Sequence, residues 1–260
     1  MTLTASKHSR GYSRIQRARS TATWLGRLYA WSGFAIMWLF WVSFVVFLAN
    51  PKQVAPFWPL PTVDAGGFVE HPLAAGGIDL ALIALFGLQH SVMARPRIKA
   101  WWASSIPEAF ERCTFVHMAN AALFALIIFW QPIPVEVWRI SDAWARDATW
   151  TLFALGWILL FAGAWSFGIF DLLGISHMRA WCRGETHRGD RLKTGLLYKW
   201  LRHPMYVGVL LGIWATPRMT AGHLLLAAGM TLYVLIAMRY EERDLMQRFG
   251  ARYAHWRASG

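Results

Sequence analysis

The chain has 260 residues, of which 56% are apolar, and its mean hydropathy is +0.33. Its 17 Trp and 16 Phe residues far exceed what a soluble domain of this length usually carries. The formal net charge of +12 lies in short segments beside long apolar stretches, where anionic lipid headgroups attract Lys and Arg, so it argues against nucleic-acid binding. Composition and charge exclude a soluble domain and predict an all-α membrane protein.

The first four apolar stretches are each long enough to cross a hydrocarbon core, which needs roughly 20 helical residues. In chain order they are residues 25–48, 76–93, 113–130 and 148–173. We interpret the segments 50–75 and 131–147 between them as outward-facing connectors.

The fifth apolar stretch, residues 205–238, would be about 50 Å long as one helix, too long for a single crossing. Its segment Ala215-Thr216-Pro217-Arg218 supplies a break, because proline cannot continue a helix and biases the preceding residue away from helical geometry. We therefore expect two antiparallel helices, the first of them short. The prediction is a polytopic bundle of five or six transmembrane helices that ends in a helical hairpin and forms one membrane domain, residues 1–260.

The distribution of Lys and Arg predicts the orientation, because cytoplasmic segments carry the excess of these residues. If successive helices alternate in direction, 22 of the 26 Lys and Arg residues fall on one side. Both termini are therefore expected in the cytoplasm. The basic residues of that side lie in residues 1–27, 94–112, 173–204 and 239–260.

Two polar motifs flank the predicted hairpin, and the hairpin should bring them together at one membrane face. The first is Arg202-His203-Pro204-Met205-Tyr206-x-Gly208. Proline is favourable in the first turn of a helix, so Pro204 predicts that a helix begins there. Arg202 and His203 would then lie at the positively polarised start of that helix, which can hold a carboxylate. Gly208 leaves room for close approach of a ligand or of another helix.

The second motif is the pair Glu241 and Glu242 at the end of the last helix, where acidic side chains need a positive partner. Neighbouring arginines could compensate them structurally, and a cationic ligand would do so equally well. Together the motifs suit a zwitterionic ligand with a further positive centre, such as the amino-acid part of S-adenosylmethionine. No spacing typical of metal ligands occurs, so we expect no metal site.

Further residues extend these two motifs in this chain: Gly195-Leu196-Leu197-Tyr198 before them, and Leu245, Phe249-Gly250 and Tyr253 after them. The whole set resembles the C-terminal half of isoprenylcysteine carboxyl methyltransferases and phospholipid methyltransferases. Further motifs are similar to NnrU and nurim-like membrane proteins and, within that group, to bacterial methanethiol S-methyltransferases. They are Gln89-His90-Ser91-Val92-Met93-Ala94-Arg95, Glu111-Arg112-x-Thr114, Trp130-Gln131-Pro132, Phe170-Asp171-Leu172-Leu173-Gly174 and residues 214–223.

The resemblance implies methyl transfer from S-adenosylmethionine to a small thiol by a multi-pass protein of the bacterial inner membrane, with the lipid bilayer as its surroundings and no protein partner. The cofactor would be bound on the cytoplasmic side by residues 175–260. The residues implied to line it are Leu197, Tyr198, Arg202, His203, Pro204, Tyr206, Gly208 and Glu242.

A thiolate is a far better nucleophile than a thiol, so something must accept the proton. The candidates for catalysis are His90, Glu241 and Glu242, although His90 could instead bond a backbone carbonyl. For Asp79 and Asp171, pairing or capping is favoured over catalysis. Two alternatives stay open: methylation of a prenylcysteine or lipid headgroup, and a non-enzymatic protein of the NnrU or nurim type.

Overall fold

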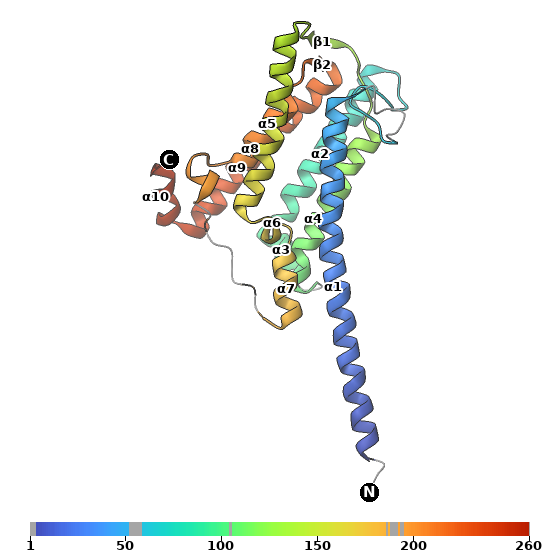
Figure 1. Ribbon diagram of the computed structural model, residues 1–260, viewed down its shortest axis with the longest axis vertical. Coiled ribbons are helices and arrows are strands. Elements are labelled where there is room, and N and C mark those ends of the chain that lie inside the picture. Colours follow the sequence, from blue (N-terminus) through green and yellow to red (C-terminus); the bar gives the residue numbers. More distant parts are fainter. Residues whose placement is uncertain are drawn as a thin grey trace.

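The chain folds into a bundle of long helices (Figure 1). The computed structural model describes residues 4–51, 59–103, 106–185, 187, 192 and 195–259. Within these ranges, five helices are long and apolar enough to cross a membrane, which confirms the predicted helical membrane fold. They are α1 (Thr4–Ala49, apolar from Thr23 onward), α2 (Pro72–Met93), α4 (Glu108–Phe129), α5 (Ala143–Phe167) and α9 (Ala221–Phe249).

Shorter helices lie between and beyond these five. The N-terminal part of α1 runs past the rest of the bundle, whereas α10 lies beside the end of α9 (Figure 1). The shorter helices are α3 (Pro96–Ala103), α6 (Ile169–Leu172), α7 (Ile175–Arg183), the 3-10 helix η1 (Leu196–Lys199), α8 (Pro204–Trp214) and α10 (Ala251–Ser259).

The predicted C-terminal hairpin is confirmed. Helix α8 begins at Pro204, ends at Trp214 and is followed by α9 from Ala221, with Pro217 in the turn between them. The fourth predicted span, 148–173, was wrong at its end. Helix α5 ends at Phe167, because Gly168 adopts φ +106° and its N–H bonds back to Ala164 and Trp165 in a left-handed cap.

A small antiparallel sheet closes the end of the bundle opposite α3 and α7 (Figure 1). It pairs β1 (Glu136–Arg139) with β2 (Arg218–Thr220), and the sequence interpretation as a plain connector missed it. Arg218 crosses from Asp64 to Glu136, with nitrogen–oxygen distances of 3.2 Å to each. This end of the bundle is therefore fixed by charged contacts between segments far apart in sequence.

Close packing of α5 against α8 sets the position of the first polar motif. A Cβ atom at Gly208 would lie 2.5 Å from the backbone N of Leu160, and one at Gly156 would lie 2.5 Å from that of Gly212. Small residues four apart allow such backbone contact between membrane helices. Of the two roles that the sequence left open for Gly208, close approach of another helix is the one that this packing accounts for.

Two buried polar side chains serve the fold. Asp79 accepts a hydrogen bond from the backbone N of Gln131 at 2.8 Å, which is neither the arginine pair nor the helix cap that the sequence interpretation favoured. His223 lies 2.9 Å from the carbonyl oxygen of Ile213 through Nε2, and so ties the start of α9 to the end of α8. Both groups are almost fully buried, and each partner offsets part of the cost of removing the group from solvent, although Oδ2 of Asp79 has no hydrogen-bond partner among the described residues.

Candidate active site

The two polar motifs meet at His203, which precedes α8 and lies between two carboxylates of α9. Its Nε2 atom is 3.5 Å from Oε1 of Glu242, and its Nδ1 atom is 3.8 Å from Oε2 of Glu241. Only 11% of the His203 side chain is exposed. One imidazole therefore bridges adjacent glutamates at the polar end of the hairpin.

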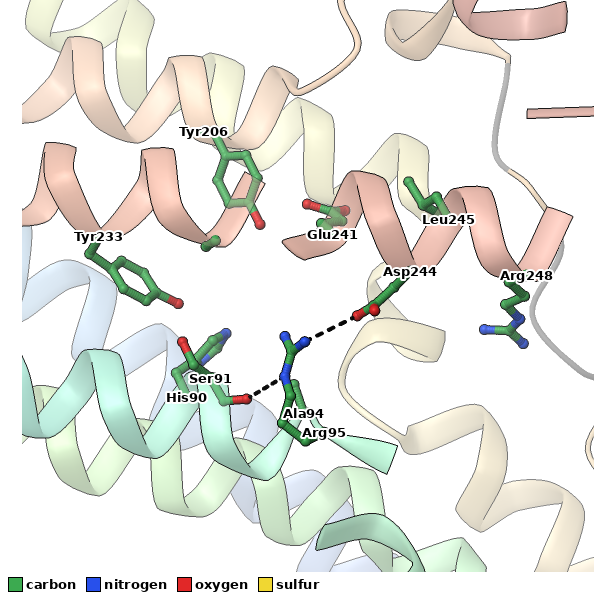
Figure 2. Close-up of a pocket in the computed structure, with 11 residues that line it drawn as sticks. His90, Ser91, Ala94, Arg95, Tyr206, Tyr233, Glu241, Asp244, Leu245 and Arg248 are labelled. Atoms are coloured by element: carbon green, nitrogen blue, oxygen red, sulfur yellow. Dashed lines mark hydrogen bonds and ion pairs between the residues drawn. The ribbon is translucent and has the colours of Figure 1, made fainter. Parts of the chain in front are cut away.

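Tyr206 extends this cluster one turn into α8. Its ring stacks on that of His203, with centroids 5.5 Å apart, and its hydroxyl is directed toward Glu241 (Figure 2). Glu241 is therefore approached by a histidine and a tyrosine from the same neighbouring helix.

A first cavity of about 100 Å³ adjoins His203 and is called the His203 cavity below. Aromatic rings from α5, α9 and α10 and charged groups from both motifs surround it. Its lining residues are Phe167, Leu192, Tyr198, Arg202, His203, Glu241, Leu245, Arg248, Phe249, Tyr253 and Trp256.

Three buried polar atoms of residues at this cavity have no hydrogen-bond partner among the residues that the structure describes: the hydroxyls of Tyr198 and Tyr253, and Oε2 of Glu241. Burial, followed by the charge of Glu241, raises the pKa of Tyr198, so its hydroxyl stays protonated and available as a donor. Buried polar atoms without partners are rare in proteins, and a group of them identifies places where a polar ligand would complete the hydrogen bonding.

A second, larger cavity of about 250 Å³ lies between α2 and α9 and is called the α2–α9 cleft (Figure 2). It shares Glu241, Leu245 and Arg248 with the His203 cavity, so these residues separate the two spaces. The other lining residues are His90, Ser91, Ala94, Arg95, Tyr206, Tyr233, Ala237 and Asp244.

His90 is held in the α2–α9 cleft by aromatic contacts. Its ring centroid is 4.7 Å from that of Phe115 and 5.3 Å from that of Phe86, and its Nδ1 atom is buried without a partner. At the polar end of the cleft, Arg95 donates to the carbonyl of Ser91 and pairs with Asp244 at 3.6 Å (Figure 2). The cleft thus changes from aromatic to charged along its length.

Four other residues predicted to bind the cofactor, Leu197, Pro204, Gly208 and Glu242, are not among the lining residues of either cavity. Glu242 contacts His203 but does not line either cavity, and Leu197 belongs to η1 beside Tyr198. Pro204 packs against Gly163 of α5.

Residues that the sequence did not single out as site residues are Tyr233, Asp244 and Trp256. A signal for Tyr233 was present, because Tyr233, Ala237, Glu241 and Leu245 are four residues apart and share one face of α9.

The fold is that of a helical membrane protein, and the comparisons with known proteins show that it is a methyltransferase. Residues 148–252, which run from α5 into α10, match the phospholipid methyltransferase family. Methanethiol S-methyltransferase 2 of Bradyrhizobium diazoefficiens is 39% identical over 88% of this chain and 84% of its own length. Methanethiol S-methyltransferase of Mycobacterium tuberculosis is 39% identical over 73% of this chain and 80% of its own length. The chain belongs to the methanethiol S-methyltransferase family.

A more distant relative is nurim of Xenopus laevis, 32% identical over 65% of this chain and 61% of its own length. No solved structure matches the chain.

Proposed function

We propose that this protein transfers the methyl group of S-adenosylmethionine to methanethiol and releases dimethyl sulfide. Its family membership supports this reaction, and the observation that carries it is His203 held between Glu241 and Glu242 beside a cavity with unpaired buried polar atoms. A structural membrane protein has no need for that arrangement, since α9 continues to Phe249 and the two carboxylates face a largely buried histidine instead of ending the helix in solvent.

The His203 cavity fits a zwitterionic cofactor in its donor set. Arg202 and the start of α8 would hold a carboxylate, and Glu241 would hold an ammonium group, with Glu242 adding its negative charge through its contact with His203. S-Adenosylmethionine supplies a methyl group on a positively charged sulfur when it is bound. Because the cavity of about 100 Å³ is smaller than the whole cofactor, we expect its aromatic wall on α9 and α10 to move on binding.

Glu241 separates the cofactor cavity from the α2–α9 cleft, which makes it the best-placed acceptor for the thiol proton. A carboxylate near the acceptor sulfur would remove its proton, and the excluded water would favour attack by the resulting thiolate. His90 lies in the same cleft and is the second candidate for this role.

The test is the production of dimethyl sulfide by detergent-purified protein, measured by headspace gas chromatography. Methanethiol and S-adenosylmethionine are each omitted in turn, and cofactor binding is measured separately by calorimetry. We expect dimethyl sulfide only when both are present. Cofactor binding without the product would redirect the proposal to lipidic acceptors, and absence of binding would support a non-enzymatic role.

The orientation is also a proposal. Successive crossings bring α2, α5 and α9 back toward the end of the bundle that holds α3 and α7 (Figure 1). Arg95 follows the end of α2, Arg179 belongs to α7, and Arg243 lies in the last two turns of α9. Because Lys and Arg are enriched in cytoplasmic segments, this end and both termini are expected in the cytoplasm. Fusions of green fluorescent protein to either terminus should fluoresce, whereas alkaline phosphatase should be active only when inserted at the β1 end.

A further inference from the structure

The α2–α9 cleft is larger than methanethiol requires. An apolar cavity of about 150 Å³ inside a protein binds benzene, which has six carbon atoms. The cleft has about 250 Å³, whereas methanethiol has two atoms other than hydrogen. The space therefore has room for an acceptor with an aromatic ring.

Tyr233, which lines the end of the cleft away from Glu241 and is called its deep end below, is held in position by residues of α2. Tyr233 lies over Gly87 of α2, where an added Cβ atom would be 3.1 Å from Cδ2 of the tyrosine ring. Its ring centroid is also 5.3 Å from that of Phe86. Aromatic rings at such distances favour edge-to-face contact with another ring, so the deep end suits an aromatic substituent.

The reacting end of the cleft lies about two helical turns away from Tyr233. Ala237 and Glu241 follow Tyr233 on the same face of α9 at intervals of four residues, which corresponds to roughly 12 Å from Tyr233 to Glu241. A thiol with its sulfur at Glu241 would therefore direct its substituent past Ala237 toward Tyr233. The unpaired Nδ1 of His90 lies on the opposite wall (Figure 2).

We propose that the α2–α9 cleft is the acceptor subsite and that it also takes larger apolar thiols of about the size of benzenethiol, with Tyr233 setting the limit. This inference rests on the proposed function. In the step, a thiol that enters protonated gives its proton to Glu241, and the sulfur lone pair forms the new bond to the methyl carbon. The bond from that carbon to the cofactor sulfur breaks and its electron pair stays there, which gives methyl phenyl sulfide and S-adenosylhomocysteine.

Ala237→Phe tests the position of the subsite, because it adds a ring to the middle of the cleft. The matched control is Ala228→Phe, which adds the same ring to an exposed position of α9. Calorimetry measures benzenethiol binding without S-adenosylmethionine, and gas chromatography measures methyl phenyl sulfide and dimethyl sulfide. We expect Ala237→Phe to weaken benzenethiol binding and turnover at least tenfold, because the new ring would occupy the space that the ring of the substrate needs. Ala228→Phe should change neither by more than twofold.

Tyr233→Ala provides a second variant with an opposite expectation. Removing the ring should raise kcat/KM for 2-naphthalenethiol relative to benzenethiol about tenfold, because the limit on acceptor length is gone. A decrease of this ratio, or equal effects of Ala237→Phe and Ala228→Phe, would overturn the assignment of the cleft.

The outcomes separate this inference from the proposed function. Dimethyl sulfide production with no binding or methylation of benzenethiol would overturn the inference and leave the proposed function intact. Failure with both thiols, despite cofactor binding, would overturn both. Methylation of both thiols with selective loss in Ala237→Phe would support both.

Discussion

Oε1 of Glu242 lies 3.5 Å from Nε2 of His203, and this contact joins α9, about two turns before its end at Phe249, to the residue before α8. The same ring approaches Glu241 through its other nitrogen. The contacts between His203 and the two glutamates thus connect the start of α8 with α9. A change in either helix would therefore alter the charge that faces the His203 cavity.

We expect Glu242→Gln to lower the affinity for S-adenosylmethionine about 10- to 100-fold. The substitution keeps the shape of the side chain but removes the charge, and hydrogen bonds to charged groups contribute about 1.5–3 kcal/mol. Isothermal titration calorimetry of the purified protein measures this. Asp147→Asn is the control, because Asp147 is exposed near the start of α5. Equal affinity of Glu242→Gln and the wild type would remove Glu242 from the proposed cofactor site.

Gly208→Ala is expected to destabilise the protein by about 1–3 kcal/mol, because the new methyl group would be 2.5 Å from the α5 backbone and would force the helices apart. Unfolding in mixed detergent and dodecyl sulfate micelles measures the change. Gly77→Ala in α2 is the matched control, since a Cβ atom there meets nothing within 4 Å. That control should be neutral or slightly stabilising, because alanine favours helix over glycine. Equal stabilities would contradict close packing at Gly208.

Much of the fold could be predicted from the sequence, because helix length and apolarity in a membrane are local properties. The break at Pro217 is local too, and α8 and α9 lie on either side of it as expected. The short sheet could not be predicted. It depends on Arg218 reaching Asp64 and Glu136, and nothing in three separate segments indicates which of their charges will meet.

The candidate site likewise has one part that could be predicted from the sequence and one part that could not. The meeting of His203 with Glu241 and Glu242 follows from a hairpin that returns to its starting face, so the sequence could predict it. The division of the site into two spaces could not be predicted, because it depends on how α2 packs against α9. Tyr233 illustrates this: its place in the cleft depends on Gly87 of another helix.

Arg218→Gln should destabilise the β1 end by about 1–2 kcal/mol. The guanidinium contacts Asp64, whose side chain is only 9% exposed, so its loss leaves a poorly solvated carboxylate with fewer donors. Partial exposure of Arg218 and Glu136 keeps the effect below that of a fully buried pair. The same unfolding assay measures it. Arg146→Gln, which removes a contact between largely exposed side chains, should stay within about 0.5 kcal/mol of the wild type. A larger effect at Arg146 than at Arg218 would contradict the role of the sheet contacts.

His90→Gln should lower kcat for methanethiol about 100-fold while the affinity for S-adenosylmethionine changes less than twofold. His90 lines the α2–α9 cleft but not the His203 cavity, so its loss should affect the acceptor step and not cofactor binding. The control is His117→Gln in α4, where both ring nitrogens already have partners, the carbonyl of Cys113 at 2.8 Å and the hydroxyl of Ser32 at 3.1 Å. That change can lower stability but should leave kcat intact. If the His90→Gln variant methylates methanethiol at the wild-type rate, His90 takes no part in removing the thiol proton, which must then go to Glu241. The role of His90 would be limited to packing among its aromatic neighbours.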